Sequence, residues 1–168
     1  LYINNTVKDH RLRICLPTRL RTNYVFCKEQ FDIAKFPIEP DTSDYSTKDK
    51  CPLKGVLPPQ WDTRPADGNI HHGFVDVFDG SKGLCVASRD TYEYWVNRNS
   101  NTIEFTLARG VEWLGIDIPI RAGRAGWEIR TPEAQCLGIH RFKFSIIPHK
   151  DHWFRSKLHV KTLNHRLD

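Results

Sequence analysis

The stretch RLRICL, residues 11–16, has the pattern that decides the fold of this chain. Its apolar residues Leu12, Ile14 and Leu16 alternate with two arginines and a cysteine. A two-residue period of this kind is typical of a β-strand with one buried face. The sequence therefore predicts a strand here, and the search for a fold starts from a half-buried sheet.

Other stretches repeat the alternation. In NTIEFTLARG (101–110) the residues predicted to point inward are Ile103, Phe105 and Leu107, and in RFKFSII (141–147) they are Phe142, Phe144 and Ile146. Shorter candidate strands are Thr22–Phe26, Phe31–Phe36, Phe74–Phe78, Leu84–Ala87 and Tyr92–Val96. Turn-forming residues such as DGSKG (79–83) separate them. Many short strands joined by turns predict an all-β fold, a β-sandwich.

Helical periodicity is weak throughout the chain. The one exception is DHWFRSKLHVKTLNHR (151–166), where an irregular apolar stripe leaves helix and strand both open. The polar stretch 39–72 is rich in Pro, Asp and Thr and contains no clear strand, so a long irregular excursion is expected there. The expected organisation is a β-sandwich domain over 1–150 that carries this excursion, followed by a truncated C-terminal extension over 151–168.

Length and composition set the broad class. The chain has 168 residues, of which 39% are hydrophobic and 27% charged, as in a globular domain. No apolar run approaches the roughly 18 to 20 residues of a membrane-spanning helix, so no membrane partner is expected. Five cysteines without a CxxC pair favour a reducing, cytoplasmic setting. The absence of Met predicts a piece of a longer protein.

Positive charge gathers at the two ends of the chain. Residues 1–28 carry six Lys and Arg against one Asp, and residues 149–168 carry five against two. Such ends could bind an anionic partner, but neither has the interleaved aromatic residues of a single-strand nucleic-acid platform. We therefore expect no nucleic-acid partner. The sequence leaves the oligomeric state open.

Established catalytic motifs are missing. The sequence has no GxSxG, Walker loop, HExxH or GxGxxG. The histidines of HKDH (149–152) and the pair His71-His72 could offer metal ligands, yet spacing alone does not show that ligands converge. Solvated histidines are the simpler interpretation. The sequence thus predicts no catalytic residue and no metal ligand in this chain.

The segment SRDTYEYWV (88–96) combines charges with aromatic rings. A sugar-contacting surface has this composition, because rings stack on pyranose faces while charges hold hydroxyls. Spacing alone favours an ordinary strand with Tyr92, Tyr94 and Val96 on one face. The functional alternative is a carbohydrate-binding module that uses Tyr92, Tyr94 and Trp95, with Trp61 or Trp127 as further contacts.

The stretch TPEAQCLGIHRFKFSIIPH (131–149) could be a catalytic loop or the entry to a buried strand. The Thr131-Pro132 pair restricts the backbone before the strand, and Gly138 allows a close approach. Cys136 and Leu137 are expected to pack. We interpret the stretch as mainly architectural.

Four stretches in order carry a resemblance to a known family. They are NNTVKDHRLRICLPT (4–18), GFVDVFDGSKGLCVAS (73–88), NTIEFTLARGVEWLG (101–115) and TPEAQCLGIHRFKFSIIPH (131–149). Together they resemble the C-terminal region of glycoside hydrolase family 38, the α-mannosidases, whose bacterial branch includes mannosylglycerate hydrolases. The resemblance covers most of the chain outside 39–72 and the last fifteen or so residues.

The resemblance implies a galactose-mutarotase-like β-sandwich that belongs to a larger, multidomain enzyme. The parent would be a retaining α-mannosidase whose zinc and Asp nucleophile lie in an N-terminal catalytic domain absent from this chain. That domain and a mannoside substrate are the implied partners, and the chain alone would be inactive. Family members lend residues of this part to the rim of the active site, and the matching position here is Arg89. The predicted substrate-binding residues are thus Arg89, Tyr92 and Tyr94.

Overall fold

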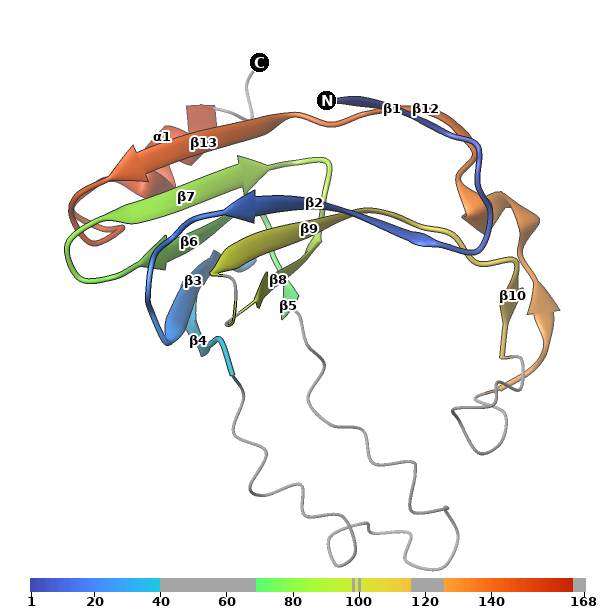
Figure 1. Ribbon diagram of the computed structural model, residues 1–168, viewed down its shortest axis with the longest axis horizontal. Coiled ribbons are helices and arrows are strands. Elements are labelled where there is room, and N and C mark those ends of the chain that lie inside the picture. The colour runs from blue at the N-terminus through green and yellow to red at the C-terminus, as the bar shows by residue number, and fades with distance from the viewer. Residues whose placement is uncertain (40–68, 98, 100, 116–125, 165–168) are drawn as a thin grey trace, which may run out of the picture.

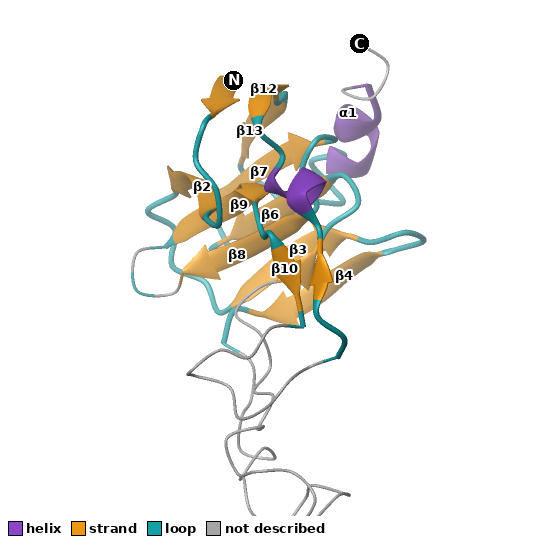
Figure 2. Cartoon of the chain, turned by 90° about the vertical axis from the view of Figure 1, so that its right-hand side faces the viewer, coloured by secondary structure: helices purple, strands orange, loops and turns teal. Residues whose placement is uncertain are grey.

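The computed structural model describes residues 1–39, 69–97, 99, 101–115 and 126–164, and two packed antiparallel sheets make up most of it (Figures 1 and 2). The five-stranded sheet has the order β13-β7-β6-β3-β4. Its strands are β3 (Tyr24–Lys28), β4 (Ile33–Pro37), β6 (Phe74–Phe78), β7 (Gly83–Ser88) and β13 (Phe144–His149). The four-stranded sheet has the order β2-β9-β8-β5. Its strands are β2 (Arg11–Pro17), β5 (Asn69–Ile70), β8 (Glu93–Asn97) and β9 (Thr102–Arg109).

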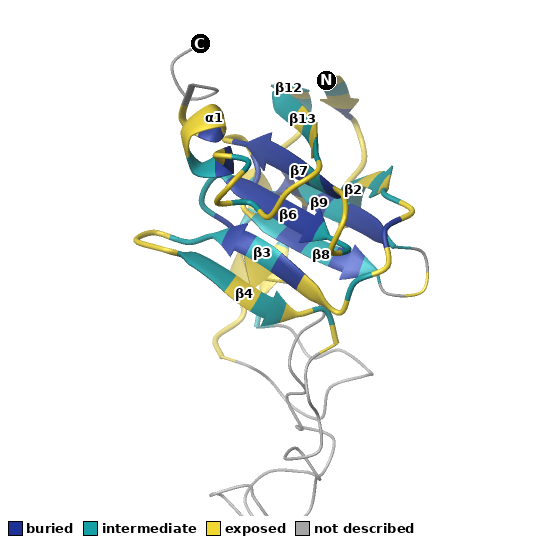
Figure 3. Ribbon diagram, turned by 90° about the vertical axis from the view of Figure 1, so that its left-hand side faces the viewer, coloured by how far each residue is buried: buried dark blue, intermediate teal, exposed yellow. Residues whose placement is uncertain are grey.

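The main core lies between these two sheets. Its buried residues are Leu20, Val25, Cys27, Val75, Val77, Val86, Tyr94, Val96, Ile103 and Phe105. Leu20 lies between β2 and β3. The others come from β3, β6 and β7 on one side and from alternate positions of β8 and β9 on the other, with Ile14 and Leu16 of β2 packed alongside. Figure 3 shows the buried central strands bordered by the more exposed β4. The predicted β-sandwich is confirmed, and the strands expected around 11–16 and 101–110 form β2 and β9.

Two residues predicted to point into this core do not do so. The β2–β9 register shifts between Leu12 and Arg13, which pair with Ala108 and Thr106, and this bulge leaves Leu107 without a partner. The alternation therefore moves by one residue, so that Ala108 is buried and Leu107 only half-buried. Ile146 is 53% exposed, because β13 is an edge strand bonded only to β7.

A second apolar cluster covers the opposite face of the five-stranded sheet. Phe74, Cys85 and Ala87 of the sheet meet Leu158 there, and Leu158 begins helix α1 (Leu158–Asn164). Of the two possibilities left open for residues 151–166, the structure has a helix over Leu158–Asn164, whereas residues 153–157 form turns. Trp153 and Leu158 of the C-terminal segment pack onto the sheet, while residues 165–168 lie outside the described part. Most of the expected 39–72 excursion also lies outside it.

A histidine and a carboxylate are buried in contact with each other beneath this C-terminal segment. His149 Nε2 lies 2.7 Å from Asp76 Oδ1, and both side chains are almost fully buried. Burial by itself lowers the pKa of His149, but the hydrogen bond and charge of Asp76, helped by the Asp151 carbonyl, outweigh it and raise the pKa. The ring passes directly over Gly83, where any Cβ would meet it. His149 therefore ties the end of β13 to the sheet centre.

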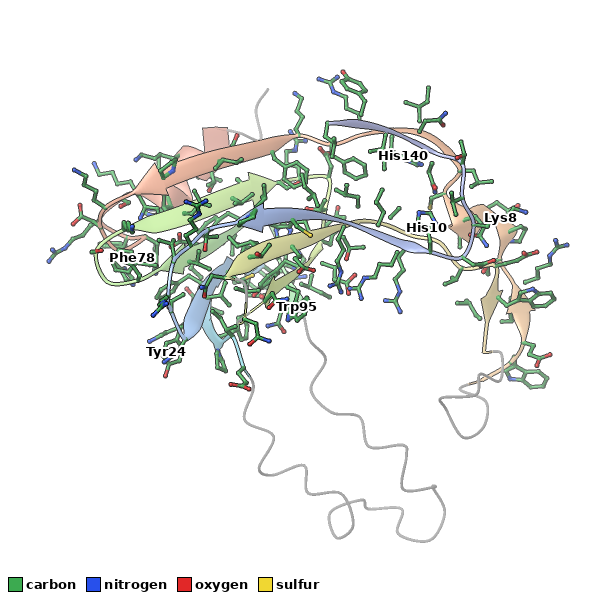
Figure 4. The ribbon with its side chains drawn as sticks, in the orientation of Figure 1. Lys8, His10, Tyr24, Phe78, Trp95 and His140 are labelled. Atoms are coloured by element: carbon green, nitrogen blue, oxygen red, sulfur yellow. The ribbon has the colours of Figure 1, made fainter. Side chains whose placement is uncertain are left out.

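Two small ribbons form an arm that extends from one end of the sandwich. We define the arm as residues 1–10, 110–115 and 126–141. It contains the ribbon β1–β12 (Tyr2–Asn5 with Gly138–Arg141), the ribbon β10–β11 (Trp113–Leu114 with Ile129–Arg130) and a short 3-10 helix, Pro132–Gln135. In Figure 4 the labelled Lys8 lies at the far end of the arm, across the molecule from Phe78.

Buried amides hold the arm together. The Asn5 side chain donates to the carbonyls of Gln135 (3.0 Å) and Cys136 (2.9 Å). Gln135 accepts the Asp9 backbone N–H at 2.8 Å and donates to the Asp9 carboxylate at 2.7 Å. Gln135 is thus an architectural residue of the 131–149 stretch, as predicted. Leu137 and Cys136 are exposed, so the expectation that they pack is wrong.

Among the described residues, no helix is long and apolar enough to cross a membrane.

Candidate functional site

A cleft of about 560 Å³ lies at the end of the sandwich where three connections between strands meet. Residues 28–30 between β3 and β4, residues 71–73 between β5 and β6, and residues 88–92 between β7 and β8 contribute to its walls. Leu163 of α1 adds an apolar contact from the C-terminal segment. The site therefore brings together four parts of the chain that are distant in sequence.

Backbone hydrogen bonds fix the three connections to one another. They run from the His72 N–H to the Lys28 carbonyl (2.7 Å), from the His71 N–H to the Tyr92 carbonyl (2.7 Å) and from the Ser88 N–H to the Gly73 carbonyl (2.9 Å). The Asp90 carboxylate also accepts the Lys143 N–H, which links the third connection to the start of β13. Because each wall is bonded to another, the cleft is a preformed feature of the sandwich.

His71 lies fully buried beneath the cleft. Its Nδ1 accepts the Gly73 N–H, and its Nε2 lies 3.3 Å from Thr91 Oγ1. The ring packs edge-on against Phe105, with centroids 5.2 Å apart. Burial, with a smaller contribution from the charge of His72, lowers the pKa of His71 to about 4. At neutral pH the ring is therefore uncharged and its Nε2–H donates to Thr91, which positions that hydroxyl at the cleft.

Two of the three predicted substrate-binding residues line this cleft together. Arg89 and Tyr92 are both exposed on its wall, with Tyr92 64% exposed. Tyr94 is only 2% exposed and belongs to the core, where its ring lies edge-on to His71 at 6.0 Å. Burial raises the pKa of Tyr94, as expected of a phenol kept from water. The structure thus gives Tyr94 a supporting position beneath the cleft.

The other aromatic candidates lie elsewhere. Trp95 projects from the outward face of the four-stranded sheet, where the Arg13 guanidinium stacks over it at 5.2 Å (Figure 4). Trp127 lies on the arm and is 87% exposed. Trp61 lies outside the described residues. Neither Trp95 nor Trp127 lines the cleft with Arg89 and Tyr92.

Sequence reasoning missed several residues of the cleft. Lys28, Glu29 and Thr91 contribute an amine, a carboxylate and a hydroxyl, and Leu163 an apolar side chain. Lys28 and Glu29 precede Tyr92 by about sixty residues, so no local pattern links them. The adjacent pair His71-His72 does stand out in the sequence, but as possible metal ligands rather than as residues of a cleft.

The histidines do not form a zinc site in the described part of the chain. His71 uses both ring nitrogens in hydrogen bonds, and so does His149, whose Nδ1 lies 2.7 Å from the Asp151 carbonyl. Among the described residues, no three His, Cys, Asp or Glu side chains gather closely enough to hold a metal ion. The residues that the structure describes therefore do not offer a site for a zinc ion.

The cleft combines side chains that suit a polyhydroxylated ligand. Arg89 and Lys28 can donate hydrogen bonds, Glu29 can accept them, and Thr91 can do both. The Tyr92 ring offers an exposed apolar face. A sugar needs both properties, since its hydroxyls require partners while its ring C–H face packs on an aromatic surface.

Known proteins resemble this chain in sequence and in fold. No protein-family model matches it. The protein named "Putative mannosylglycerate hydrolase" from Halalkalibacterium halodurans is 29% identical over 160 residues, which are 94% of this chain and 14% of that protein. The crystal structure of an alpha-mannosidase from Enterococcus faecalis matches with a TM-score of 0.73 and 27% identity.

A protein in glycosyl hydrolase family 38, also from Enterococcus faecalis, matches with a TM-score of 0.71 and 25% identity. Each of the two structural matches covers 99% of this chain and 16% of the other. The chain thus spans only about a sixth of these relatives. The predicted resemblance is confirmed: this chain is similar, in sequence and in fold, to a portion of the α-mannosidases of glycoside hydrolase family 38.

Proposed function

We propose that this chain is the C-terminal β-sandwich portion of a retaining α-mannosidase-type glycoside hydrolase. The observation that carries the proposal is that nearly the whole chain matches a portion of two such proteins, one of them an alpha-mannosidase. The similarity to a mannosylglycerate hydrolase supports the same class of reaction, hydrolysis of a glycosidic bond. The catalytic carboxylates and the zinc would belong to an N-terminal catalytic domain of the parent protein.

The role proposed for this chain is to complete the rim of the active site. Arg89 would donate hydrogen bonds to mannoside hydroxyls, and the exposed Tyr92 ring would pack on the sugar face. Such contacts place a substrate without taking part in bond cleavage, so they act on binding and orientation. The buried, neutral His71 supports them from below by holding Thr91.

The first test is hydrolysis of a chromogenic α-mannoside in the presence of zinc. We expect the chain alone to be inactive, and its mixture with the upstream region of the parent to be active. Activity in the chain alone would place the catalytic groups within these 168 residues and refute the proposal. Inactivity of the complete parent toward α-mannosides would refute it as well.

Variants at the cleft test the rim role in the active parent. Removing Arg89 or Tyr92 should raise KM by about 10-fold, since one good contact is worth about 1.4 kcal/mol. Tyr24→Ala is the matched control, because Tyr24 is also an exposed tyrosine but lies on β3 and does not line this cleft. An unchanged KM in both Arg89→Ala and Tyr92→Ala would remove the cleft from the substrate site.

A carbohydrate-binding module is the second candidate, and the exposure of Tyr92 beside polar side chains favours it. It predicts that the isolated chain binds mannosides in calorimetry and that Tyr92→Ala abolishes the binding. Tyr94→Ala is unsuitable as a test because Tyr94 is buried in the core. Absence of heat at millimolar mannoside would dismiss this candidate and leave the first one standing.

We also propose a reducing, cytoplasmic setting for the parent. The four cysteines among the described residues, Cys15, Cys27, Cys85 and Cys136, are all free thiols. Burial raises the pKa of Cys27 to about 12, so this thiol is unreactive and serves as a small core residue. Thiol titration of protein purified without reductant tests the setting, since a disulfide between any two of them would argue against it.

A further inference from the structure

The arm exposes apolar side chains on both faces of its outer ribbon. In β10–β11, Trp113 pairs with Arg130 and Leu114 pairs with Ile129. Residues directly opposite each other share a face of a ribbon, so Trp113 lies on one face and Leu114 with Ile129 on the other. All four residues are exposed. A two-stranded ribbon without cover is marginally stable at best in water.

The ribbon β1–β12 exposes a second apolar surface. Tyr2 pairs with Arg141 and Asn4 with Ile139, so these four side chains share its outer face. Tyr2 is exposed and Ile139 is 78% exposed. The Arg141 guanidinium stacks over the Tyr2 ring at 5.6 Å, which adds a cation to the patch. Both ribbons of the arm therefore present apolar side chains to solvent.

The arm holds these residues in fixed positions. The Glu112 N–H donates to the Asp9 carboxylate at 3.0 Å, and the Thr131 N–H donates to the Glu112 carbonyl at 2.6 Å. The Glu112 side chain also binds Arg130 through two hydrogen bonds of 2.9 and 2.7 Å. These bonds connect β10–β11 to the contact between Asp9 and the buried Gln135. The exposed apolar surface is thus preorganised, as binding surfaces commonly are.

We propose that the arm is an interdomain docking surface, with β10–β11 inserted between elements of the remaining part of the same polypeptide. This inference rests on the proposed function, since it requires a parent longer than this chain. The matched portion is only 14 to 16% of each relative, so most of the parent is available as the partner. An exposed apolar patch on a fixed scaffold is typical of an interface.

The apolar side chains on both faces of β10–β11 favour the rest of the same polypeptide as the partner, rather than a second copy of the chain. In a two-fold symmetric dimer whose patches meet face to face, one face of β10–β11 would be covered and the other would stay in water. Insertion into a groove covers Trp113 on one face and Leu114 with Ile129 on the other. Covalent connection to the partner raises its effective concentration, so a modest interface is sufficient.

Hydrogen–deuterium exchange of the full-length parent tests the proposal. We expect the backbone amides of peptides covering 111–115 and 126–131 to exchange about 100-fold slower than those of an unstructured chain. Amides covered by the partner exchange only when the interface separates. The double variant Leu114→Ser/Ile129→Ser should lose at least tenfold of this protection. Phe31→Ser is the matched control, since Phe31 is 97% exposed and lies outside the arm; it should leave the protection unchanged.

Protection below tenfold in the wild-type parent would overturn the proposal without any variant. A second result would also overturn the proposal. If the protection disappears on dilution while a dimer dissociates to monomers, the surface binds a second copy of the chain. α-Mannoside hydrolysis measured on the same samples separates this inference from the proposed function. Protection without hydrolysis refutes only the function, whereas hydrolysis without protection refutes only the docking.

Discussion

Acid should destabilise the sandwich through His71, the residue beneath the candidate cleft. In the folded chain burial lowers its pKa to about 4, against an ordinary value of 6.5. The unfolded chain therefore binds a proton between these pH values and the folded chain does not, so stability is complete above pH 6.5 and falls as the pH is lowered toward 4. A difference of about 2.5 pKa units corresponds to about 3 kcal/mol of unfolding free energy.

Urea unfolding of the chain at several pH values between 7.5 and 4 provides the assay. The variant His71→Phe serves as the reference, because a phenyl ring can occupy the site beside Phe105 and does not titrate. The wild type should lose about 3 kcal/mol more than this variant over the range, since other titrating groups are common to both. Equal losses in the two proteins would show that His71 is not held neutral by burial and would refute the reasoning.

The other predictions concern residues that hold the framework together, each measured by urea unfolding. Gly83→Ala should cost about 1 to 3 kcal/mol by overpacking, because its Cβ would lie 2.2 Å from His149 Cε1; unchanged stability would contradict the contact. Gln135→Leu should cost about 1 to 2 kcal/mol, since it removes both hydrogen bonds to Asp9, and wild-type stability would exclude their importance. His149→Gln, measured below the ordinary histidine pKa of 6.5, should cost about 3 to 5 kcal/mol by leaving the buried Asp76 without the protonated imidazole. Because the pKa of His149 is raised, its contribution is present below the ordinary histidine pKa and declines as the pH rises through the raised value. The stability of His149→Gln should therefore not decline over this pH range. A decline identical to that of the wild type would argue against the contribution of the His149–Asp76 pair.

Local sequence determined most of the strands and the fold class. Alternation in 11–16 and 101–110 marks β2 and β9, because one buried face needs an apolar residue at every second position. The same logic failed at Leu107 and Ile146, since a bulge and an edge strand depend on the neighbouring strands rather than on local pattern. The motif 131–149 also carried the resemblance to glycoside hydrolase family 38, yet only the fold shows that Gln135 bonds to Asp9.

The candidate site could be predicted only in part. SRDTYEYWV contains Arg89 and Tyr92, which line the candidate cleft, but alternation placed Tyr92 and Tyr94 on one face and could not tell that Tyr94 faces the core while Tyr92 faces the cleft. Lys28, Glu29 and Leu163 reach the cleft through sheet order and through docking of the C-terminal segment. The sequence by itself thus determined most strands of the two sheets, because their alternation depends on neighbouring residues, whereas the short strands β5, β10, β11 and β12 were not predicted. The tertiary structure decided which side chains meet, because long-range strand pairing and packing bring distant connections to one end of the sandwich.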